Sequence, residues 1–212
     1  MQAQDQYPVR FSVDYPEREL DRVSSAFRIF AVIPIAIVLA AVSGGEYARF
    51  GNGQAGEGGV VAAGGILFFA PLLMILFRQK YPRWWFDWNL ELSRFSSRVG
   101  AYVLLMDDKY PSTDEEQSVH LEIPYPDVAN DLNRWLPLVK WLLAIPHYIA
   151  LFFLLVALVV VAVIAWFAVL FTGRYPRGLF DFAEGVLRWA NRVTAYAFIL
   201  ATDRYPPFRL SP

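Results

Sequence analysis

Cysteine is absent from this 212-residue sequence, which excludes disulfides, zinc–thiolate sites and thiol nucleophiles. With only two histidines, a His-rich metal centre is not expected, and we expect no other cofactor. Charged residues are also few, at 18% of the chain, whereas a soluble domain usually carries more because its surface must stay solvated. The net charge of −1 argues against nucleic acid as a partner, because nucleic acid selects for a strongly basic face.

Apolar residues are abundant instead. The chain is 56% hydrophobic and 17% aromatic, and its mean hydropathy is +0.34. Residues 1–26 are polar and acidic, without the basic segment and short apolar run of a cleaved signal peptide. We therefore expect a mainly α-helical integral membrane protein that enters the bilayer through its own hydrophobic segments.

The sequence repeats itself. Residues 9–16 match residues 119–126, and both segments alternate apolar and polar residues before ending at Tyr-Pro, as a short strand does. Both copies end on a similar phrase, Asp-Lys-Tyr-Pro at 108–111 and Asp-Arg-Tyr-Pro at 203–206. Matched positions between these ends include Arg22, Arg28 and Pro34 in the first copy and Arg134, Lys140 and Pro146 in the second. So many matches in one order predict an internal duplication.

We therefore predict two tandem units, residues 7–111 and residues 118–210, joined by an acidic linker at residues 112–117. Each unit is expected to contain a short β-strand, a transmembrane helical hairpin and an amphipathic helix at the membrane interface. The strands at 9–13 and 119–123 are expected to form a small cytoplasmic β-layer.

The hairpins are predicted from the apolar runs. The first unit has two runs, 27–42 and 60–77, separated by the Gly-rich polar stretch 43–59. The second unit has one continuous run, 138–171. Because about 20 apolar residues cross a bilayer, this run is long for one crossing and short for two with a loop. Two tightly joined helices are favoured, since the first unit contains two runs; a single long, tilted helix is the alternative.

The basic residues predict the orientation. Of the 19 Lys and Arg residues, only Arg49 lies in the stretch 43–59. By the positive-inside tendency, the N-terminal, central and C-terminal segments face the cytoplasm and this stretch faces outward. Both units then have the same orientation, which makes a parallel repeat, unlike the inverted repeats of many secondary transporters. We expect a multi-pass protein of the bacterial inner membrane with both termini in the cytoplasm.

The helix after each hairpin carries a charged stripe. Asp87, Glu91, Arg94 and Arg98 are spaced by four, three and four residues, which places them on one side of a helix. The second unit repeats the stripe with Asp181, Glu184, Arg188 and Arg192. A wide apolar face with a narrow charged stripe is typical of a helix at the membrane interface. Alternatively, these helices pack on the cytoplasmic strands as part of an ordinary core.

Arginines of these helices are candidates for binding anionic lipid head groups, because a guanidinium donates forked hydrogen bonds to phosphate. The candidates are Arg83, Arg94, Arg98, Arg177, Arg188 and Arg192. The alternative role is positive-inside anchoring, together with ion pairs along the helix.

Other conspicuous residues have structural interpretations. Asp87 and Asp181 are expected to be helix-start acids that face exposed backbone N–H groups. Pro34 and Pro146 are expected to kink spanning helices. His147 lies in an apolar run, but the matching residue of the first unit is Ile35, so a hydrogen bond to a neighbouring helix is favoured over proton transfer.

The chain resembles the bacterial membrane family catalogued only as domain of unknown function 4389. The phrase at residues 171–182, Phe-Thr-Gly-Arg-Tyr-Pro-Arg-Gly-Leu-Phe-Asp-Phe, carries the resemblance, together with Pro146-His147 and the segment 203–208. The resemblance covers both units as two tandem copies, more faithfully the second; the first has Arg-Gln-Lys at 78–80 where the second has Thr-Gly-Arg at 172–174. It implies a bacterial inner-membrane protein and brings no catalytic residues.

No catalytic motif is recognisable: there is no Gly-x-Ser-x-Gly, His-Glu-x-x-His or Gly-rich phosphate loop. We expect a non-enzymatic scaffold or accessory subunit of a membrane assembly. Its expected partners are membrane lipids, with anionic lipids as candidates, and it is expected to act as a homo-oligomer or as part of a complex. The alternative is an oligomeric channel or lipid-handling protein, with a pathway lined by small residues such as those at 62–65. A membrane enzyme ranks last.

Overall fold

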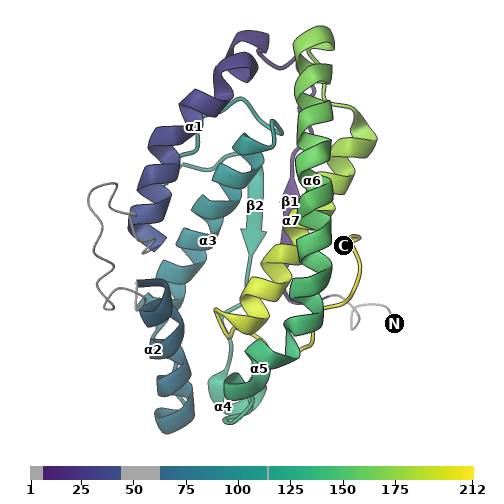
Figure 1. Cartoon of the computed structure of the whole chain (residues 1–212). Helices are drawn as coiled ribbons and strands as arrows, with labels where there is room; N and C mark the ends of the chain where they lie inside the picture. Colours follow the sequence, from purple (N-terminus) through teal and green to yellow (C-terminus); the bar gives the residue numbers. More distant parts are fainter. Residues whose placement is uncertain (1–6, 44–62, 114) are drawn as a thin grey trace, which may run out of the picture.

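The computed structural model describes residues 7–43, 63–113 and 115–212 (Figure 1). It confirms a mainly helical protein with a small sheet. The elements in chain order are β1 (Arg10–Val13), α1 (Arg22–Ser43), α2 (Ala63–Arg78), α3 (Arg83–Val103), β2 (Val119–Glu122), α4 (Val128–Asp131), α5 (Pro137–Leu143), α6 (Ile145–Thr172) and α7 (Arg177–Ala197). Nearly all of the expected outer loop at 43–59, and the side chains of the small residues at 62–65, lie outside the described residues.

The two predicted strands pair with each other. β1 and β2 form a two-stranded antiparallel sheet in which Phe11 is opposite Leu121 and Arg10 is opposite Glu122. Because successive side chains of a strand point to opposite faces, Phe11 and Leu121 are buried while Arg10 and Glu122 are exposed. One face of the sheet therefore belongs to the core and the other is polar.

The helices form two further layers. β2 packs on α3 and β1 packs on α7, while α1 packs on α3 and α6 packs on α7. The helices α3 and α7 thus lie between the sheet and the long apolar helices, which is the packing on the strands that was expected as the alternative. The alternative, packing on the strands, holds because their charged stripes find backbone partners in the segments around them.

Each strand packs on the helix of the other predicted unit. β1 belongs to residues 7–111 but contacts α7, and β2 belongs to residues 118–210 but contacts α3. The two predicted units therefore interlock instead of forming separate bodies.

The hairpin prediction is wrong for the second unit. α6 is one continuous helix of 28 residues, preceded by the short α5. After Pro146 the run contains no glycine or proline that could turn the chain, and α6 ends where Gly173 adopts a left-handed conformation with φ of +70°. The alternative of a single long helix is the observed one.

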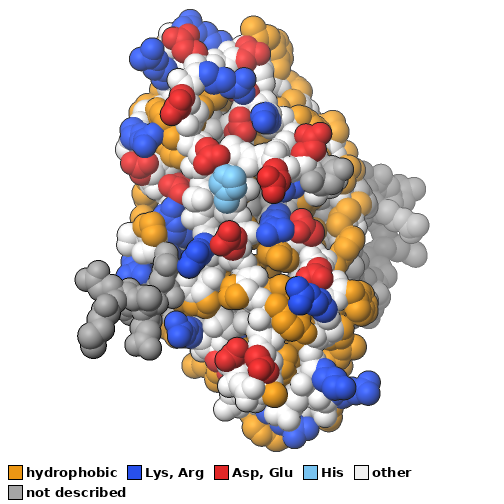
Figure 2. Space-filling model, turned by 180° about the vertical axis from the view of Figure 1, so that it is seen from behind, with side chains coloured by type: hydrophobic (Ala, Val, Ile, Leu, Met, Phe, Trp, Pro, Cys, Tyr) orange, Lys and Arg blue, Asp and Glu red, His pale blue; other side chains and the backbone are white. Residues whose placement is uncertain are grey.

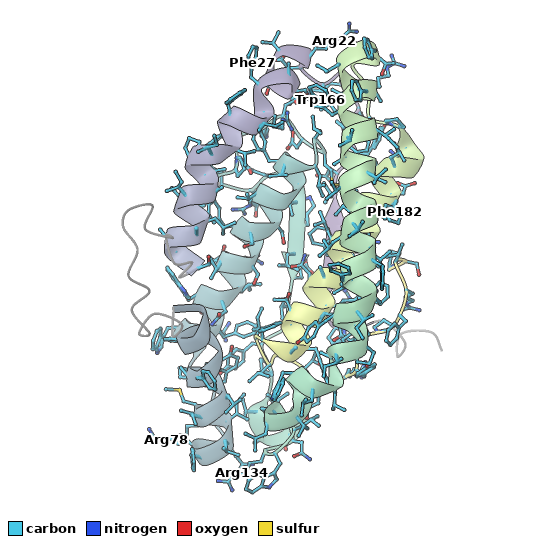
Figure 3. The ribbon with its side chains drawn as sticks, viewed as in Figure 1. Arg22, Phe27, Arg78, Arg134, Trp166 and Phe182 are labelled. Atoms are coloured by element: carbon cyan, nitrogen blue, oxygen red, sulfur yellow. The ribbon has the colours of Figure 1, made fainter. Side chains whose placement is uncertain are left out.

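The direction of the helices also differs from the prediction. In Figure 1, α1 descends from the top and α2 continues to the bottom, whereas α6 rises from the bottom to the top. Figure 3 shows Arg78 and Arg134 at one end of the molecule and Arg22, which approaches Gly173, at the other. The Tyr-Pro-Arg segments at 81–83 and 175–177, which follow α2 and α6, thus lie at opposite ends along the helices, whereas two units of the same orientation would place them at one end.

Only one of the two expected kink positions is inside a helix. Pro34 lies within α1. Pro146 occupies the first turn of α6, where a missing N–H removes no hydrogen bond, so it starts a helix instead of kinking one.

A buried ion pair attaches α1 to the segment that follows α3. The Arg28 side chain, which is only 3% exposed, donates from Nη2 to Asp108 Oδ1 at 2.6 Å. Its Nη1 donates to the carbonyl oxygens of Tyr102 and Asp107 at 3.0 and 2.5 Å, and its Cζ lies 4.3 Å from the centre of the Tyr102 ring. Asp108 also accepts from the backbone N–H of Asp21 at 2.8 Å.

The matching contact attaches α5 to the segment that follows α7. Lys140 is fully buried, and its Nζ lies 2.7 Å from Asp203 Oδ1 and donates to the carbonyl of Thr202 at 2.7 Å. The Nζ lies 5.2 Å from the centre of the Tyr196 ring, and Asp203 accepts from the backbone N–H of Asn133 at 2.5 Å. The predicted correspondence between Arg28 and Lys140 therefore extends to their partners.

Replacing Arg28 tests how much its buried ion pair with Asp108 contributes to stability. We expect Arg28→Ala to lower the unfolding free energy by about 3–5 kcal/mol, because it leaves the carboxylate of Asp108 without its buried partner. The matched control is Arg83→Ala, at an exposed site, where a change within about 0.5 kcal/mol is expected. Tryptophan fluorescence during denaturation in detergent micelles measures both; equal midpoints for the two variants would contradict the expectation.

Candidate lipid-contacting site

An extended apolar surface runs along α1 and α6. Both helices are long and apolar enough to cross a membrane by length and composition. α6 buries only a narrow stripe of side chains, and α1 buries still fewer. Large exposed side chains of these two helices include Phe27, Phe30, Ile33, Ile37, Ile149, Phe152, Phe153, Val156, Val159, Val160, Val163, Phe167 and Phe171. A contiguous apolar surface of this kind marks a site of interaction with a membrane or another protein.

Charge does not interrupt this surface. α6 contains no Asp, Glu, Lys or Arg between its first residue and its last. Beyond Arg22, the charged residue of α1 is Arg28, whose side chain is buried against Asp108. We call the exposed apolar side chains of α1, α2, α5 and α6 the apolar face.

The opposite side of the molecule is charged. Figure 2 shows acidic and basic side chains over its whole height. The outer face of the sheet contributes Arg10, which lies 4.0 Å from Glu122, and His120, whose Nε2 lies 2.9 Å from Asp14 Oδ2. We call this side the charged face.

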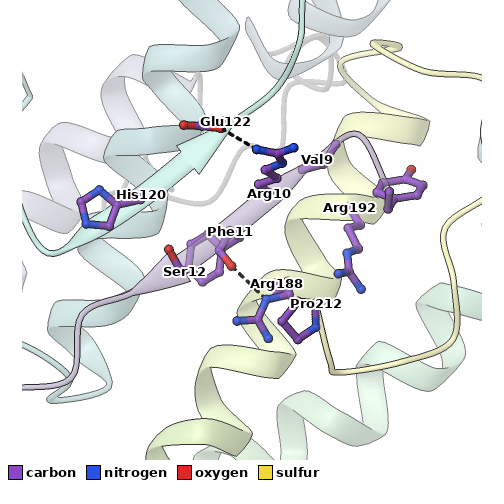
Figure 4. Close-up of a pocket in the computed structure, with 10 residues that line it drawn as sticks. Val9, Arg10, Phe11, Ser12, His120, Glu122, Arg188, Arg192 and Pro212 are labelled. Carbon is purple, nitrogen blue, oxygen red and sulfur yellow. Dashed lines mark hydrogen bonds and ion pairs between the residues drawn. The ribbon is translucent and has the colours of Figure 1, made fainter. Parts of the chain in front are cut away.

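A shallow pocket of about 320 Å³ opens at the sheet, between β1, β2 and α7 (Figure 4). Arg188 and Arg192 line it, together with Arg10, His120 and Glu122 from the strands. Among the described residues there is no group of three or more acidic or histidine side chains that could hold a metal ion. Arg188 and Arg192 donate hydrogen bonds to backbone carbonyls, and Arg10 and His120 pair with Glu122 and Asp14.

Arg94 and Arg188 bind the strands. Arg94 donates from Nε to the carbonyl of Leu121 at 3.0 Å, and Arg188 donates from Nε to the carbonyl of Phe11 at 2.9 Å. Each arginine therefore holds the strand of the other predicted unit. Arg188 is the more buried of the two; it also donates to the carbonyl of Leu210 at 2.8 Å and pairs with Glu184.

Arg98 and Arg192 bind the segments that follow their helices. Arg98 donates to the carbonyl of Ser112 at 2.9 Å, and Arg192 donates to the carbonyls of Arg209 and Ser211 at 3.2 and 3.0 Å. Burial lowers the pKa of Arg192, and the charges of Arg188 and Arg209 act in the same direction. Burial also raises the pKa of Tyr7, whose ring lies 5.8 Å from the Arg192 Cζ.

Four of the six candidate arginines are thus engaged by the protein. The buried side chains of Arg98, Arg188 and Arg192 cannot approach a lipid phosphate, and Arg94 is bonded to Leu121 and Glu91. In these four arginines, N–H groups that the lipid prediction assigned to phosphate donate instead to backbone carbonyls of the strands and of the segments after α3 and α7.

Arg83 and Arg177 are different. They are the first residues of α3 and α7, and their side chains are 75% and 66% exposed. The Cζ of Arg83 lies 5.2 Å from the centre of the Tyr125 ring, and that of Arg177 lies 4.1 Å from the centre of the Tyr15 ring. A guanidinium stacked over an aromatic face keeps N–H groups directed outward, where an anion can accept them.

The tyrosines beneath these arginines were not singled out from the sequence. Tyr125 donates from its hydroxyl to the carbonyl of Tyr81 at 2.5 Å, and Tyr15 donates to the carbonyl of Tyr175 at 2.6 Å. The signal that could have found them is the Tyr-Pro that ends both repeated strands. As with the strands, each tyrosine contacts the other predicted unit.

The two expected helix-start acids lie one turn further along. α3 and α7 have no acidic residue in the first turn. Asp87 lies 3.9 Å from Arg83, and Asp181 lies 4.0 Å from Arg177, both at i,i+4 spacing. These carboxylates therefore pair loosely with the exposed arginines and do not cap the helices.

The side chain of His147 is buried and is hydrogen-bonded to a neighbouring helix. Its Nδ1 accepts a hydrogen bond from Trp189 Nε1 of α7 at 3.0 Å, and its ring stacks on Phe208 with centroids 4.0 Å apart. This is the hydrogen bond to a neighbouring helix that the sequence analysis favoured.

Arg188 and Arg94 both bind a strand but differ in burial, so their replacement should affect stability to different extents. We expect Arg188→Met to lower the free energy of unfolding by about 3 kcal/mol, because it leaves two carbonyls and the half-buried Glu184 without their hydrogen-bond donor. We expect Arg94→Met to lower it by about 1 kcal/mol, because water can replace its contacts. Denaturant unfolding of both variants in the same detergent measures the difference. A larger loss for Arg94→Met would contradict this assignment.

Comparison with known proteins identifies one part of the chain. Residues 135–209, which include α5, α6 and α7, match the family described as Domain of unknown function (DUF4389). One copy is matched, in the second predicted unit, and not two. No curated protein and no solved structure matches the chain. Residues 135–209 are therefore similar to this family of unknown function.

Proposed function

We propose that the protein is a non-enzymatic scaffold or accessory subunit embedded in the bacterial inner membrane. The observation that carries the proposal is the uninterrupted apolar face of α1 and α6, set against a charged face on the other side. Apolar surface is driven out of water, whereas exposed ionised groups must keep their hydration. Acyl chains on one side and water on the other satisfy both faces at once.

A structural role is supported by the use of the buried ionisable groups. Arg28, Lys140, Arg188 and Arg192 each donate to backbone carbonyls of a distant segment or of a chain end. Groups used in this way fasten elements together, which suits a rigid platform better than chemistry on a substrate.

The proposal includes the origin of the fold from two tandem copies. Matched contacts support it: Arg28 corresponds to Lys140, and the bond from Arg94 to β2 corresponds to that from Arg188 to β1. The backbone agrees, because the leucines at 105 and 200, after α3 and α7, both have φ of 61°, a conformation that a leucine seldom adopts.

Contact with lipid head groups belongs to the same proposal, now assigned to Arg83 and Arg177. Exposed tryptophans, which prefer the membrane–water interface, support it; they are Trp84, Trp88, Trp135 and Trp141. By the positive-inside tendency, the charged face and both chain ends would face the cytoplasm.

Native mass spectrometry of the protein, extracted gently from its own membrane, tests the scaffold role. We expect a heteromeric assembly with a stoichiometric partner, because the charged face offers a rigid protein-binding surface. A homo-oligomer that conducts ions in proteoliposomes would contradict the proposal and favour an oligomeric channel.

The double variant Arg83→Ala/Arg177→Ala tests the lipid contact. We expect it to lose most of the phosphatidylglycerol or cardiolipin that co-purifies with the protein, since two forked phosphate donors are removed. The matched control is Arg10→Ala, which removes an exposed arginine from the charged face and should leave the lipid content unchanged. Undiminished anionic lipid in the double variant would rule out these two arginines as head-group sites.

A further inference from the structure

The middle of the charged face lies beside the middle of α6. Figure 1 places β1 and β2 at mid-height along this helix. The outer face of the sheet carries Arg10, His120 and Glu122, with side chains 63%, 54% and 70% exposed. If α6 crossed the bilayer, these groups would lie at the depth of its centre, where charged side chains are strongly disfavoured.

The length of α6 also argues against a crossing of the bilayer. Its 28 residues extend over about 42 Å at about 1.5 Å per residue, whereas the hydrocarbon core is about 30 Å thick. An apolar helix longer than the core must tilt when it crosses, but nothing limits its length when it lies along a leaflet.

The relation between the two halves gives a third argument. In Figure 1, α1 and α2 descend on one side while α6 ascends on the other, so a half-turn about the line of sight exchanges them. Arg83 and Arg177 therefore lie toward opposite ends of the long axis. Crossing along this axis would place one of these matched arginines on each side of the membrane. Lying flat places both at the same depth, as the positive-inside tendency requires.

We infer that the protein is embedded in one leaflet, with α1, α2, α5 and α6 parallel to the membrane plane. Acyl chains of that leaflet cover the apolar face, and the charged face stays in water. The inference rests on the proposed membrane embedding and adds its geometry: no helix crosses the bilayer, and both ends of the molecule are on one side.

The absence of cysteine allows single labels without background. Ile149, Val156 and Val163 are exposed on α6 at a spacing of seven residues, so they lie along one line of the helix. Each is replaced by Cys and spin-labelled in vesicles of phosphatidylethanolamine and phosphatidylglycerol. Relaxation by oxygen and by a water-soluble nickel chelate then reports the depth of each label.

A flat arrangement predicts the same depth for all three labels, in the acyl region. If α6 crossed the bilayer, Val156 and Val163, which lie within about 7 Å of the helix centre, would be deep, and Ile149, about 14 Å from it, would be shallow. Such a difference in depth along the helix would overturn the inference while leaving membrane embedding intact. The control is Glu122→Cys on the charged face, where the nickel chelate should have full access. If all three α6 labels were as accessible to nickel as this control, membrane embedding itself, and with it the proposed function, would fail.

Sidedness gives a second, independent readout. Lys80→Cys and Arg174→Cys place single thiols at the exposed ends after α2 and α6. In spheroplasts treated with a membrane-impermeant maleimide, we expect the two to react to the same extent, either both labelled or both protected until the membrane is permeabilised. Labelling of one and protection of the other would show that the long axis crosses the membrane and would overturn the inference.

Discussion

Two buried cation–carboxylate pairs connect the apolar layer to the rest of the molecule. Arg28 with Asp108 and Lys140 with Asp203 join α1 and α5 to the segments that follow α3 and α7. In an interior of low dielectric constant, a partnered charge is strongly attracted to its counterion, and an unpartnered charge is costly. The position of the apolar helices over α3 and α7 therefore depends on these pairs as well as on apolar packing, which has little direction of its own.

The exchange of strands explains why two halves with so many apolar side chains form one body. Arg94 and Arg188 each hold the strand of the opposite half, and Tyr125 and Tyr15 make the same exchange at the ends of the strands. Neither half can bury the inner face of its own strand alone. The result is a charged face built from both halves and an apolar face built from both halves, a division that suits a platform lying between lipid and water.

Much of the local structure could be predicted from the sequence. The alternation at residues 9–13 and 119–123 predicted two strands that pair, and the spacing of Arg94 from Arg98 and of Arg188 from Arg192 placed each pair on one side of a helix. The fold between these elements was not predictable in the same way. An apolar run does not by itself show whether the chain turns within it, because apolar side chains pack equally well against lipid, a partner helix or a protein core. The hairpin expected within residues 138–171 was wrong for that reason.

The sequence by itself determined which kinds of segment the fold contains: long apolar runs, helices that carry a stripe of charged residues and two short amphipathic strands. These follow from local periodicity and composition, which depend on neighbours in the chain. Only the tertiary structure decided which partner each cation has, because a guanidinium binds whichever carbonyl or phosphate lies within hydrogen-bond distance. Arg98, Arg188 and Arg192 are bonded inside the protein, whereas Arg83 and Arg177 stay exposed, although all five lie on matched helices.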